Sequence, residues 1–248
     1  MVRPGRHELR QWLLIIAALS KNLPFGLLIL YALTPFLASN VWARPLELEN
    51  RISESARVLK DMMNAPDGSI PSDLLRSSRA VVIFPSVIKA GLGVGGQYGT
   101  GVILRRNPST RKWGPPAFIT LVGGSFGWQV GVQATDLVLL VMSDVSLRSL
   151  FHDKFTIGAD ASVAAGPIGR DASASTDITL SAGILSYSRA KGIYAGVSLQ
   201  GSVMQADWEA NEKYYGSDLS MIDRFFEGKG PISPTAGRLI ELLNKYSR

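Results

Sequence analysis

Between Arg79 and Asp207 the chain consists of short apolar segments that are rich in β-branched and aromatic residues and are separated by glycine. Such segments are typical of β-strands, because these side chains fit a pleated sheet and glycine tolerates bends and close approaches. The strand-like segments read RAVVIF, QYGTGVILRR, AFITLVGG, FGWQVGVQA, DLVLLVM, DITLSAGILSYS and IYAGVSLQGSVMQAD. Strict alternation in one of them predicts a single buried face made by Phe126, Trp128, Val130 and Val132.

Helical patterns lie on both sides of this series. Residues 46–63 place apolar side chains close to one helical face and charged side chains on the other, and Pro71 begins a second, short helix. Helical patterns return after residue 206, and the last of them begins at Ser233. Strands in succession with helices gathered at the two ends predict an α+β fold. We expect a largely antiparallel sheet, curled or closed into a sandwich-like or barrel-like core, with helices at the N- and C-terminal ends.

One glycine run has the spacing of a nucleotide-binding turn. Gly91, Gly93 and Gly96 in GLGVGG match the pattern G-x-G-x-x-G. That turn requires a helix directly after the glycines and an acidic residue about twenty positions later. Here the strand-like QYGTGVILRR follows, and the later stretch RKWGPPAF contains no acid. We therefore expect these glycines to mark a strand that bends or passes close to another backbone.

The residue types exclude several kinds of catalytic and metal site. The chain has no cysteine, and its two histidines are His7 and His152, so thiolate nucleophiles, disulfides and ordinary zinc sites are excluded. His152 falls in the last turn of a predicted helix, where a histidine more often interacts with the helix dipole than with a substrate. We expect no metal, no cofactor and no catalytic residue.

Carboxylates leave a glycan hydrolase as a distant alternative. Asp136, Asp144 and Asp160 fall near predicted strand or helix ends, and two carboxyl groups ~5 to 9 Å apart could perform acid–base chemistry. Structural roles account for two of them, because Asp144 is placed to cap a helix and Asp136 lies at a turn. We therefore predict that the chain is not an enzyme.

The N-terminal segment predicts export. It begins with arginines and contains two apolar blocks, of which the second, residues 25–38, is short for a membrane span and suits a signal peptide. The residues VWA at 41–43 offer a cleavage site, so we expect residues 1–43 to be a signal peptide and residues 44–248 to form the domain. The alternative is an uncleaved anchor through residues 12–38. Either way we expect the domain in a bacterial periplasm or cell envelope.

The positive charge gives little support to a nucleic-acid partner. The whole chain carries a formal charge of +6, but without residues 1–43 it has 22 basic and 19 acidic residues, a charge of +3. Part of the basic character therefore belongs to the targeting segment. We expect no nucleic-acid partner.

Several longer phrases occur in a fixed order: VVIFPSVIKAGLGVGGQYGTGVIL, KWGPPAFITLVGGSFGWQVGVQATDLVLLVM, GADASVAAGPIGRDAS and YSRAKGIYAGVSLQGSVMQADWEANEKYYG. Together they resemble the SYLF domain family over about residues 50–247. The resemblance implies a lipid-binding domain that recognises anionic headgroups, phosphoinositides in eukaryotic members, with actin binding in some fungal and plant members. It implies no enzymatic reaction. Because the chain has a predicted export signal, we do not expect actin as its partner.

Basic residues within these phrases are the candidate lipid contacts. Arg189 and Lys191 lie in YSRAKGIYAG, Arg170 lies in GPIGRDAS and Lys89 lies in SVIKAG. Loop cations beside glycine can present charged groups and backbone N–H donors to a phosphate, although each is also compatible with a solvated turn charge. Trp113, in the turn NPSTRKWGPP, is the candidate for shallow insertion into a headgroup layer.

The combined prediction is a non-enzymatic domain that binds anionic phospholipids at a membrane surface. In eukaryotic members a basic amphipathic helix at the start of the domain contributes to membrane contact, but in the matching residues 46–63 acidic side chains balance the basic ones. We expect this helix to dock its apolar face on the domain. The alternative function is an envelope scaffold that binds a protein partner.

Overall fold

The computed structural model describes residues 46–66, 69–150, 155–168, 182–190, 193–194, 199–216, 225–228 and 230–248, without the side chains of 92–94, 125–130 and 193–194. The predicted export segment, His152, Arg170 and Lys191 lie outside the described residues. The predictions made for them therefore stay predictions.

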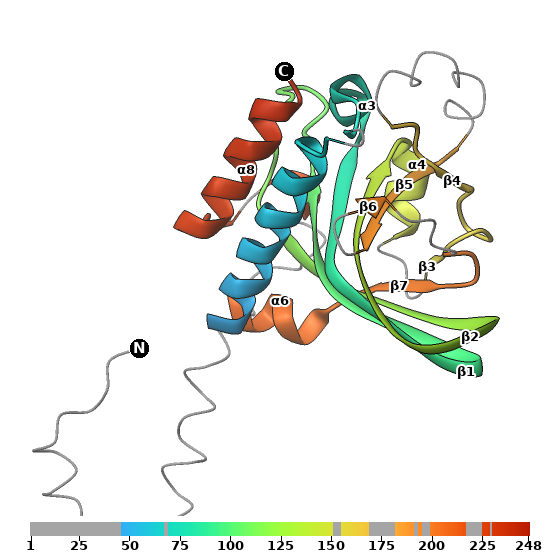
Figure 1. Ribbon diagram of the computed structural model, residues 1–248. Coiled ribbons are helices and arrows are strands. Elements are labelled where there is room, and N and C mark those ends of the chain that lie inside the picture. The colour runs from blue at the N-terminus through green and yellow to red at the C-terminus, as the bar shows by residue number, and fades with distance from the viewer. Residues whose placement is uncertain are drawn as a thin grey trace, which may run out of the picture. The chain divides into compact units, whose positions relative to one another are not determined.

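Two long antiparallel strands form the frame of the molecule (Figure 1). They are β1 (Ala80–Arg105) and β2 (Ala117–Val141), which pair along almost their whole length. The glycine-rich residues 91–96 lie inside β1, opposite a second glycine-containing stretch at 124–131 of β2. The prediction that these glycines belong to a strand is confirmed. The local pattern had indicated several short strands, whereas bulges, not turns, separate the apolar segments within each long strand.

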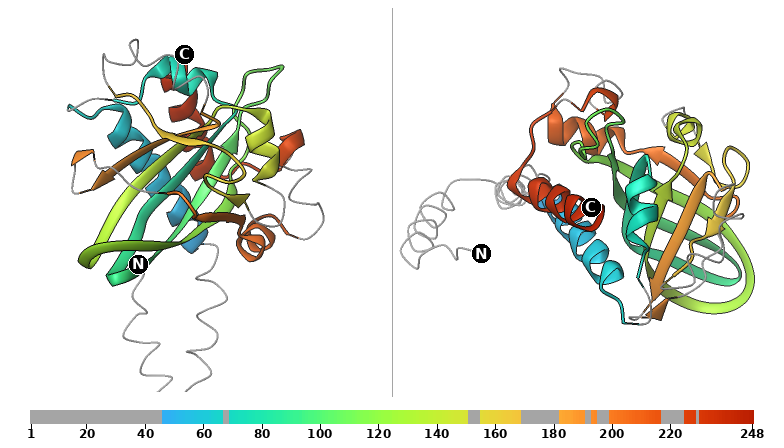
Figure 2. Two further views of the ribbon diagram at one scale, coloured as in Figure 1. Left: turned by 90° about the vertical axis from the view of Figure 1, so that its right-hand side faces the viewer. Right: turned by 90° about the horizontal axis from the view of Figure 1, so that it is seen from above.

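The β1–β2 ribbon bends back so that the two halves of β1 approach each other. An added Cβ on Gly101 would lie 2.2 Å from the carbonyl oxygen of Ile83, and one on Gly99 would lie 2.9 Å from a methyl group of Val87. Only glycine leaves room for this approach. Figure 2 shows the resulting curl of the ribbon from above.

Within the described ranges, five shorter strands complete a seven-stranded sheet. They are β3 (Phe155–Thr156), β4 (Val163–Ala165), β5 (Ile184–Ala190), β6 (Ile193–Tyr194) and β7 (Val203–Ala206). Along β2, β7 pairs with residues 119–122 and β5 with residues 136–141; β3 adds to β7, while β4 and β6 add to β5. Among the strands that the structure describes, every strand pairing is antiparallel except β4 with β5, which confirms the predicted largely antiparallel, curled sheet.

The helices precede and follow this sheet, with one short helix between strands. They are residues 46–63, α3 (Ser72–Ser77), α4 (Asp144–Ser149), α6 (Trp208–Tyr215) and α8 (Pro234–Tyr246). The helix of residues 46–63 and α8 lie side by side against one face of the sheet (Figures 1 and 2). None of the helices in the described ranges is long and apolar enough to cross a bilayer.

Both faces of the central strands are buried, which explains their continuous apolar runs. In β1, Val81 and Ile83 belong to a helix-side cluster that packs under the helices, whereas Val82 and Phe84 belong to an inner cluster enclosed by the curl. The helix-side cluster also contains Ile52, Leu59, Phe118, Val138, Leu140, Leu239 and Leu243. The inner cluster also contains Ile119, Leu137, Leu139, Phe155 and Met204.

Two local predictions are corrected. Val132 is 76% exposed and therefore does not belong to a buried face; its partner across the ribbon, Ala90, is exposed as well. The helix-side cluster does not extend this far along the ribbon. Ser143, not Asp144, is the N-cap of α4, because the Ser143 side chain accepts a hydrogen bond from the Ser146 N–H.

A polar group joins three helices at one edge of the helix layer. The Tyr214 hydroxyl on α6 lies 2.9 Å from Oε1 of Glu49 and 2.8 Å from Oγ of Ser233, and Ser233 donates to the other Glu49 oxygen at 3.0 Å. Ser233 is also the N-cap of α8. Burial, the largest cause, raises the pKa of Tyr214 to about 12; the nearby Glu49 carboxylate raises it as well, and the Ser233 contact lowers it.

Replacing Gly101 with alanine should destabilise the fold, because the new methyl group would collide with the backbone at Ile83. Overpacking of this kind costs about 1–3 kcal/mol of unfolding free energy. The matched control is Gly124→Ala in the same ribbon, where an added Cβ meets nothing within 4 Å. Urea unfolding of both variants measures the difference, and equal stability of the two would contradict the close approach.

Stability should fall between pH 10 and pH 12 partly because of Tyr214. Its folded-state pKa of about 12 lies above the ordinary value of 10.0, so the folded protein keeps this proton where the unfolded chain releases it. The contribution is complete below pH 10 and is lost as the pH rises through 12. Urea unfolding at pH 8 and pH 11 should show a smaller decline for Tyr214→Phe than for the natural chain. An unchanged decline would contradict this assignment.

Candidate functional site

The loop between β1 and β2 is a tight turn organised by Asn107. Its Oδ1 accepts hydrogen bonds from the backbone N–H groups of Ser109 and Thr110, both at 2.9 Å, and its carbonyl accepts one from Arg111 at 2.9 Å. An asparagine side chain stabilises turns in this way. Arg111 adopts a φ of 60°, in the left-handed region, which completes the turn.

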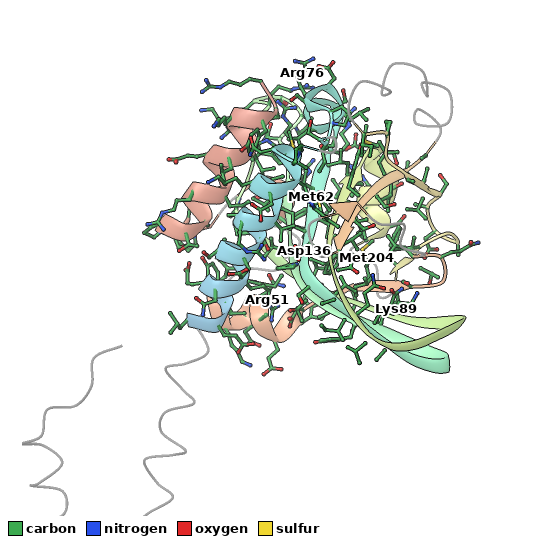
Figure 3. The ribbon with its side chains drawn as sticks, in the orientation of Figure 1. Arg51, Met62, Arg76, Lys89, Asp136 and Met204 are labelled. Carbon is green, nitrogen blue, oxygen red and sulfur yellow. The ribbon has the colours of Figure 1, made fainter. Side chains whose placement is uncertain are left out.

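Four basic residues gather at this loop, and we call Arg76, Arg106, Arg111 and Lys112 the basic cluster. The Arg106 and Arg111 guanidinium groups both donate to the backbone carbonyl of Arg76, the second at 3.1 Å. Arg106 Nε also donates to the Arg111 carbonyl at 2.9 Å. Figure 3 shows Arg76 at the α3 end of the molecule. Backbone carbonyls, and not carboxylates, hold these guanidinium groups together.

The basic cluster keeps most of its positive charge. Arg76 pairs with Asp73, whose side chain is 81% exposed, and such surface pairs contribute only about 0–1 kcal/mol. Arg106, Arg111 and Lys112 form no ion pair within the described part of the chain. Burial lowers the pKa of Arg106, and the positive charges of Arg111 and Arg76 lower it further.

Trp113 is buried, which contradicts its predicted position at a membrane-facing turn. Its side chain is 4% exposed, its Nε1 donates to Oγ of Ser247 at 3.2 Å, and the Arg106 guanidinium lies 5.7 Å from the centre of its ring. The chain folds back at this point, and an isolated antiparallel β-bridge joins Arg106 to Trp113. The Trp113 ring therefore packs under the loop, against the C-terminal end of α8. Trp113 supports the basic cluster from beneath.

A cavity of about 140 Å³ adjoins the basic cluster. The β1–β2 connection lines it with Arg105, Asn107, Thr110 and Lys112, and residues 225–228 form another part of its wall. Arg105 Nη1 donates to the Phe226 carbonyl, and the guanidinium lies 5.0 Å from the centre of the Phe226 ring. Burial lowers the pKa of Arg105, because a buried charge loses hydration.

Of the cations predicted from the sequence to contact lipid, the two that the structure describes, Arg189 and Lys89, lie elsewhere. Arg189 stands opposite Asp136 on neighbouring strands and donates to the Asp61 carbonyl at 3.1 Å. Lys89 is half-buried on β1 opposite Gln133, well away from Arg76 in Figure 3. Neither belongs to the basic cluster, and Arg170 and Lys191 are outside the described residues.

The carboxylates considered for catalysis have structural contacts. Asp136 Oδ1 accepts from the Ser86 N–H at 3.0 Å, and Asp160 Oδ2 accepts from the Thr156 N–H at 2.6 Å. Asp144 lies 3.4 Å from Arg79. Within the described ranges, no three acidic or histidine side chains converge where they could hold a metal ion.

The N-terminal helix docks on the sheet, as predicted. Ile52 and Leu59 are fully buried in the helix-side cluster. On its exposed face Arg57 donates to Glu54 at 2.8 Å and to Asp61 at 3.1 Å, and the hydrogen bond with Glu54 is the main cause that raises the pKa of Arg57. This arginine is neutralised by its neighbours, so the helix is a poor electrostatic anchor.

Comparison with known proteins identifies the family. The model of the Ysc84 family, described as Las17-binding protein actin regulator, matches residues 122–246, half of the chain. The chain belongs to the Ysc84 family. It is 31% identical over 209 residues to the SH3 domain-containing YSC84-like protein 1 of Rattus norvegicus, covering 82% of this chain and 61% of that protein. It is 32% identical over 207 residues to Protein YSC84 of Saccharomyces cerevisiae, covering 80% of this chain and 44% of that protein.

This result confirms the resemblance to the SYLF domain family. A third relative, the LAS seventeen-binding protein 3 of Saccharomyces cerevisiae, is 32% identical over 184 residues, which cover 71% of this chain and 40% of that protein. The chain thus spans at most about three fifths of the length of these three Ysc84-family relatives. What their names say of binding partners applies to those proteins.

The family phrase NEKYYG serves the fold. Asn211 is buried and bonds both the N–H and the carbonyl of Phe118, at 2.9 and 2.8 Å, while Tyr215 donates to the Pro116 carbonyl. Gly216 ends α6 with a φ of 78°, which favours glycine. This phrase therefore fastens α6 to the start of β2.

The basic cluster was missed from the sequence. A local signal was present, because RRNPSTRK places four basic residues around one Asn-Pro turn. No sequence pattern indicates that Arg76 lies beside that turn, because only the tertiary fold brings the two together.

Neutralising Lys112 should leave the fold intact and relieve repulsion within the basic cluster. Its side chain has no ion pair among the described residues, so Lys112→Gln should change the unfolding free energy by at most about 0.5 kcal/mol, as exposed substitutions do. Any gain at low salt should vanish in 1 M NaCl, where charges are screened within about 3 Å. Thermal unfolding at the two salt concentrations is the measurement. A clear loss of stability at low salt would show that Lys112 has a carboxylate partner.

Proposed function

We propose that this chain is a non-catalytic domain that binds the anionic phospholipid surface of a membrane, outside the cytoplasm, through the basic cluster. The observation that carries the proposal is the arrangement of Arg76, Arg106, Arg111 and Lys112. Backbone carbonyls hold the guanidinium groups of Arg106 and Arg111, and of the four cations only Arg76 pairs with a carboxylate, the exposed Asp73, within the described residues. A cation without a carboxylate partner keeps its charge available for a phosphate.

Electrostatics make the basic cluster a better membrane contact than the residues proposed from the sequence. Each basic residue near an anionic surface contributes about 1 kcal/mol of binding free energy. Arg189 stands beside Asp136, so part of its attraction to a headgroup is cancelled. Lys89 has no such acidic neighbour across the ribbon, because it lies opposite Gln133, but it is a single charge.

Protein binding is a second candidate function. The family description, Las17-binding protein actin regulator, names proteins as partners. An exposed face of the ribbon supports this alternative, because Ile88 and Val132 are 41% and 76% exposed and belong to residue pairs that lie two positions apart in the β1–β2 ladder, on one face. The predicted export segment argues against actin, so an envelope protein would be the partner.

Vesicle sedimentation of residues 44–248 tests the first proposal. We expect weak binding to phosphatidylcholine alone, and binding to mixtures with phosphatidylglycerol or cardiolipin that decreases at high salt. Arg111→Gln with Lys112→Gln should weaken this binding by roughly 30-fold, because two charges of about 1 kcal/mol each are lost.

The matched control removes two charges elsewhere, by Lys89→Gln with Arg189→Gln. It should weaken binding far less than the cluster variant does. The opposite order would transfer the contact to the residues proposed from the sequence. Absence of binding to every anionic vesicle, by folded protein, would reject lipid binding and favour a protein partner, to be sought by crosslinking in the envelope.

A further inference from the structure

The cavity beside the basic cluster has a lining that is rich in hydrogen-bond donors. Asn107 uses its Oδ1 for the loop, which leaves its side-chain N–H groups without a partner in the described residues. The Lys112 ammonium group likewise has no ion pair there, and the Thr110 hydroxyl can donate toward the cavity that it lines. These donors come from six consecutive residues, so the turn fixes their spacing.

Arg105 adds a guanidinium group that forms no close ion pair among the described residues. One nitrogen donates to the Phe226 carbonyl, but Nε is buried with no hydrogen-bond partner, and no carboxylate of the described residues forms an ion pair with this side chain. Arg105 is half-buried, and Asp144 acts on its charge without forming an ion pair, so a bound anion would supply a close counter-charge to this guanidinium group. The pKa of Arg105 is lowered by burial, which agrees with this view.

The size of the cavity limits the ligand. A volume of about 140 Å³ is well below the ~300 Å³ at which pockets for drug-sized molecules begin. It suits one small anionic group that enters from solvent or from the end of a larger molecule. Phosphate matches the lining best, because arginine, lysine, amide and hydroxyl donors around one centre are the groups that bind phosphate oxygens.

We propose that this cavity is a binding site for a single phosphate monoester group, held by Arg105, Lys112, Thr110 and the Asn107 amide. The proposal rests on the proposed function in that the cavity shares Lys112 with the basic cluster, so a lipid headgroup ending in a phosphate monoester could reach it from the membrane surface. A free phosphate compound would present the same chemistry. The site adds a preference for terminal phosphate to the general attraction of the basic cluster for negative charge.

Glu227 provides a test of the sign of the ligand's charge, because its carboxylate lies in the wall of the same cavity. A carboxylate repels a phosphate, whereas it would help to bind a cation or an amine. Neutralising Glu227 should therefore strengthen the binding of an anion, whereas the loss of a contact that supports the cavity wall should weaken it.

The experiment uses the full chain in a non-ionic detergent and inorganic phosphate as the probe, with binding measured by calorimetry at pH 7.5. We expect saturable binding, tightened at least about threefold by Glu227→Gln, since like charges close together repel. Thr110→Val keeps the side-chain shape and should weaken binding by about fivefold, the effect of one lost hydrogen bond. Ser109→Ala, in the same turn but outside the lining, is the control and should change nothing.

A second arm adds lipids to the detergent micelles to identify the source of the phosphate. Phosphatidic acid ends in a phosphate monoester and phosphatidylglycerol in a diester, so a lipid ligand predicts a preference for phosphatidic acid that Thr110→Val reduces. Binding of inorganic phosphate without this preference would assign the site to a soluble phosphate compound.

Two results would overturn the site: no saturable phosphate binding by the natural chain, or weaker binding by Glu227→Gln. These failures are separate from failure of the proposed function. Vesicle binding that depends on Arg111 and Lys112 would persist if only the cavity were wrong. Phosphate binding with the Glu227 effect, by a protein that sediments with no vesicle, would leave the cavity established and reject the membrane.

Discussion

The close approach of the two halves of β1 is the constraint on which the rest of the structure depends. Because Gly99 and Gly101 carry no side chain, the strand can fold back, and its end returns to its beginning. A backbone hydrogen bond joins the two ends of the strand, because the Arg106 N–H donates to the Arg79 carbonyl at 2.8 Å. The turn that follows β1 is thereby brought to the last turn of α3, which contains Arg76. The basic cluster is thus a consequence of a glycine-dependent crossing elsewhere in the sheet.

The helix layer depends on polar contacts as much as on apolar packing. Arg51 and Asp207 form an ion pair of 2.9 Å with side chains only 12% and 19% exposed, and Arg51 lies over the ring of Phe118. Asp207 is also the N-cap of α6, so the pair fixes both the N-terminal helix and the start of α6. Removing one partner of such a pair would leave a poorly solvated charge, which is why buried pairs fix geometry more reliably than they add stability.

The sequence predicted the fold class but neither the continuity of its strands nor the location of its charge. β-Branched runs and glycines identify strands because those preferences are local. Whether two apolar segments are joined by a turn or by a bulge is decided by the partner strand, so β1 and β2 were predicted as several pieces. Trp113 was misplaced for the same reason. A tryptophan in an isolated polar turn would be exposed. Here the turn covers the ring of Trp113, and the Ser247 hydroxyl accepts a hydrogen bond from the indole N–H.

The family phrases were informative about identity and less so about the site. NEKYYG serves packing, as the bonds of Asn211 to Phe118 show, and a phrase can be specific because a buried contact tolerates few alternatives. The residues of the basic cluster are not restricted by buried packing in this way. Such cations form a binding site only when the fold brings them together. What distinguishes them from Arg57, which sits between two carboxylates, is the acceptor. A backbone carbonyl orients a guanidinium group without neutralising it, so the chain holds two arginines together and leaves their charge for a ligand that is itself anionic.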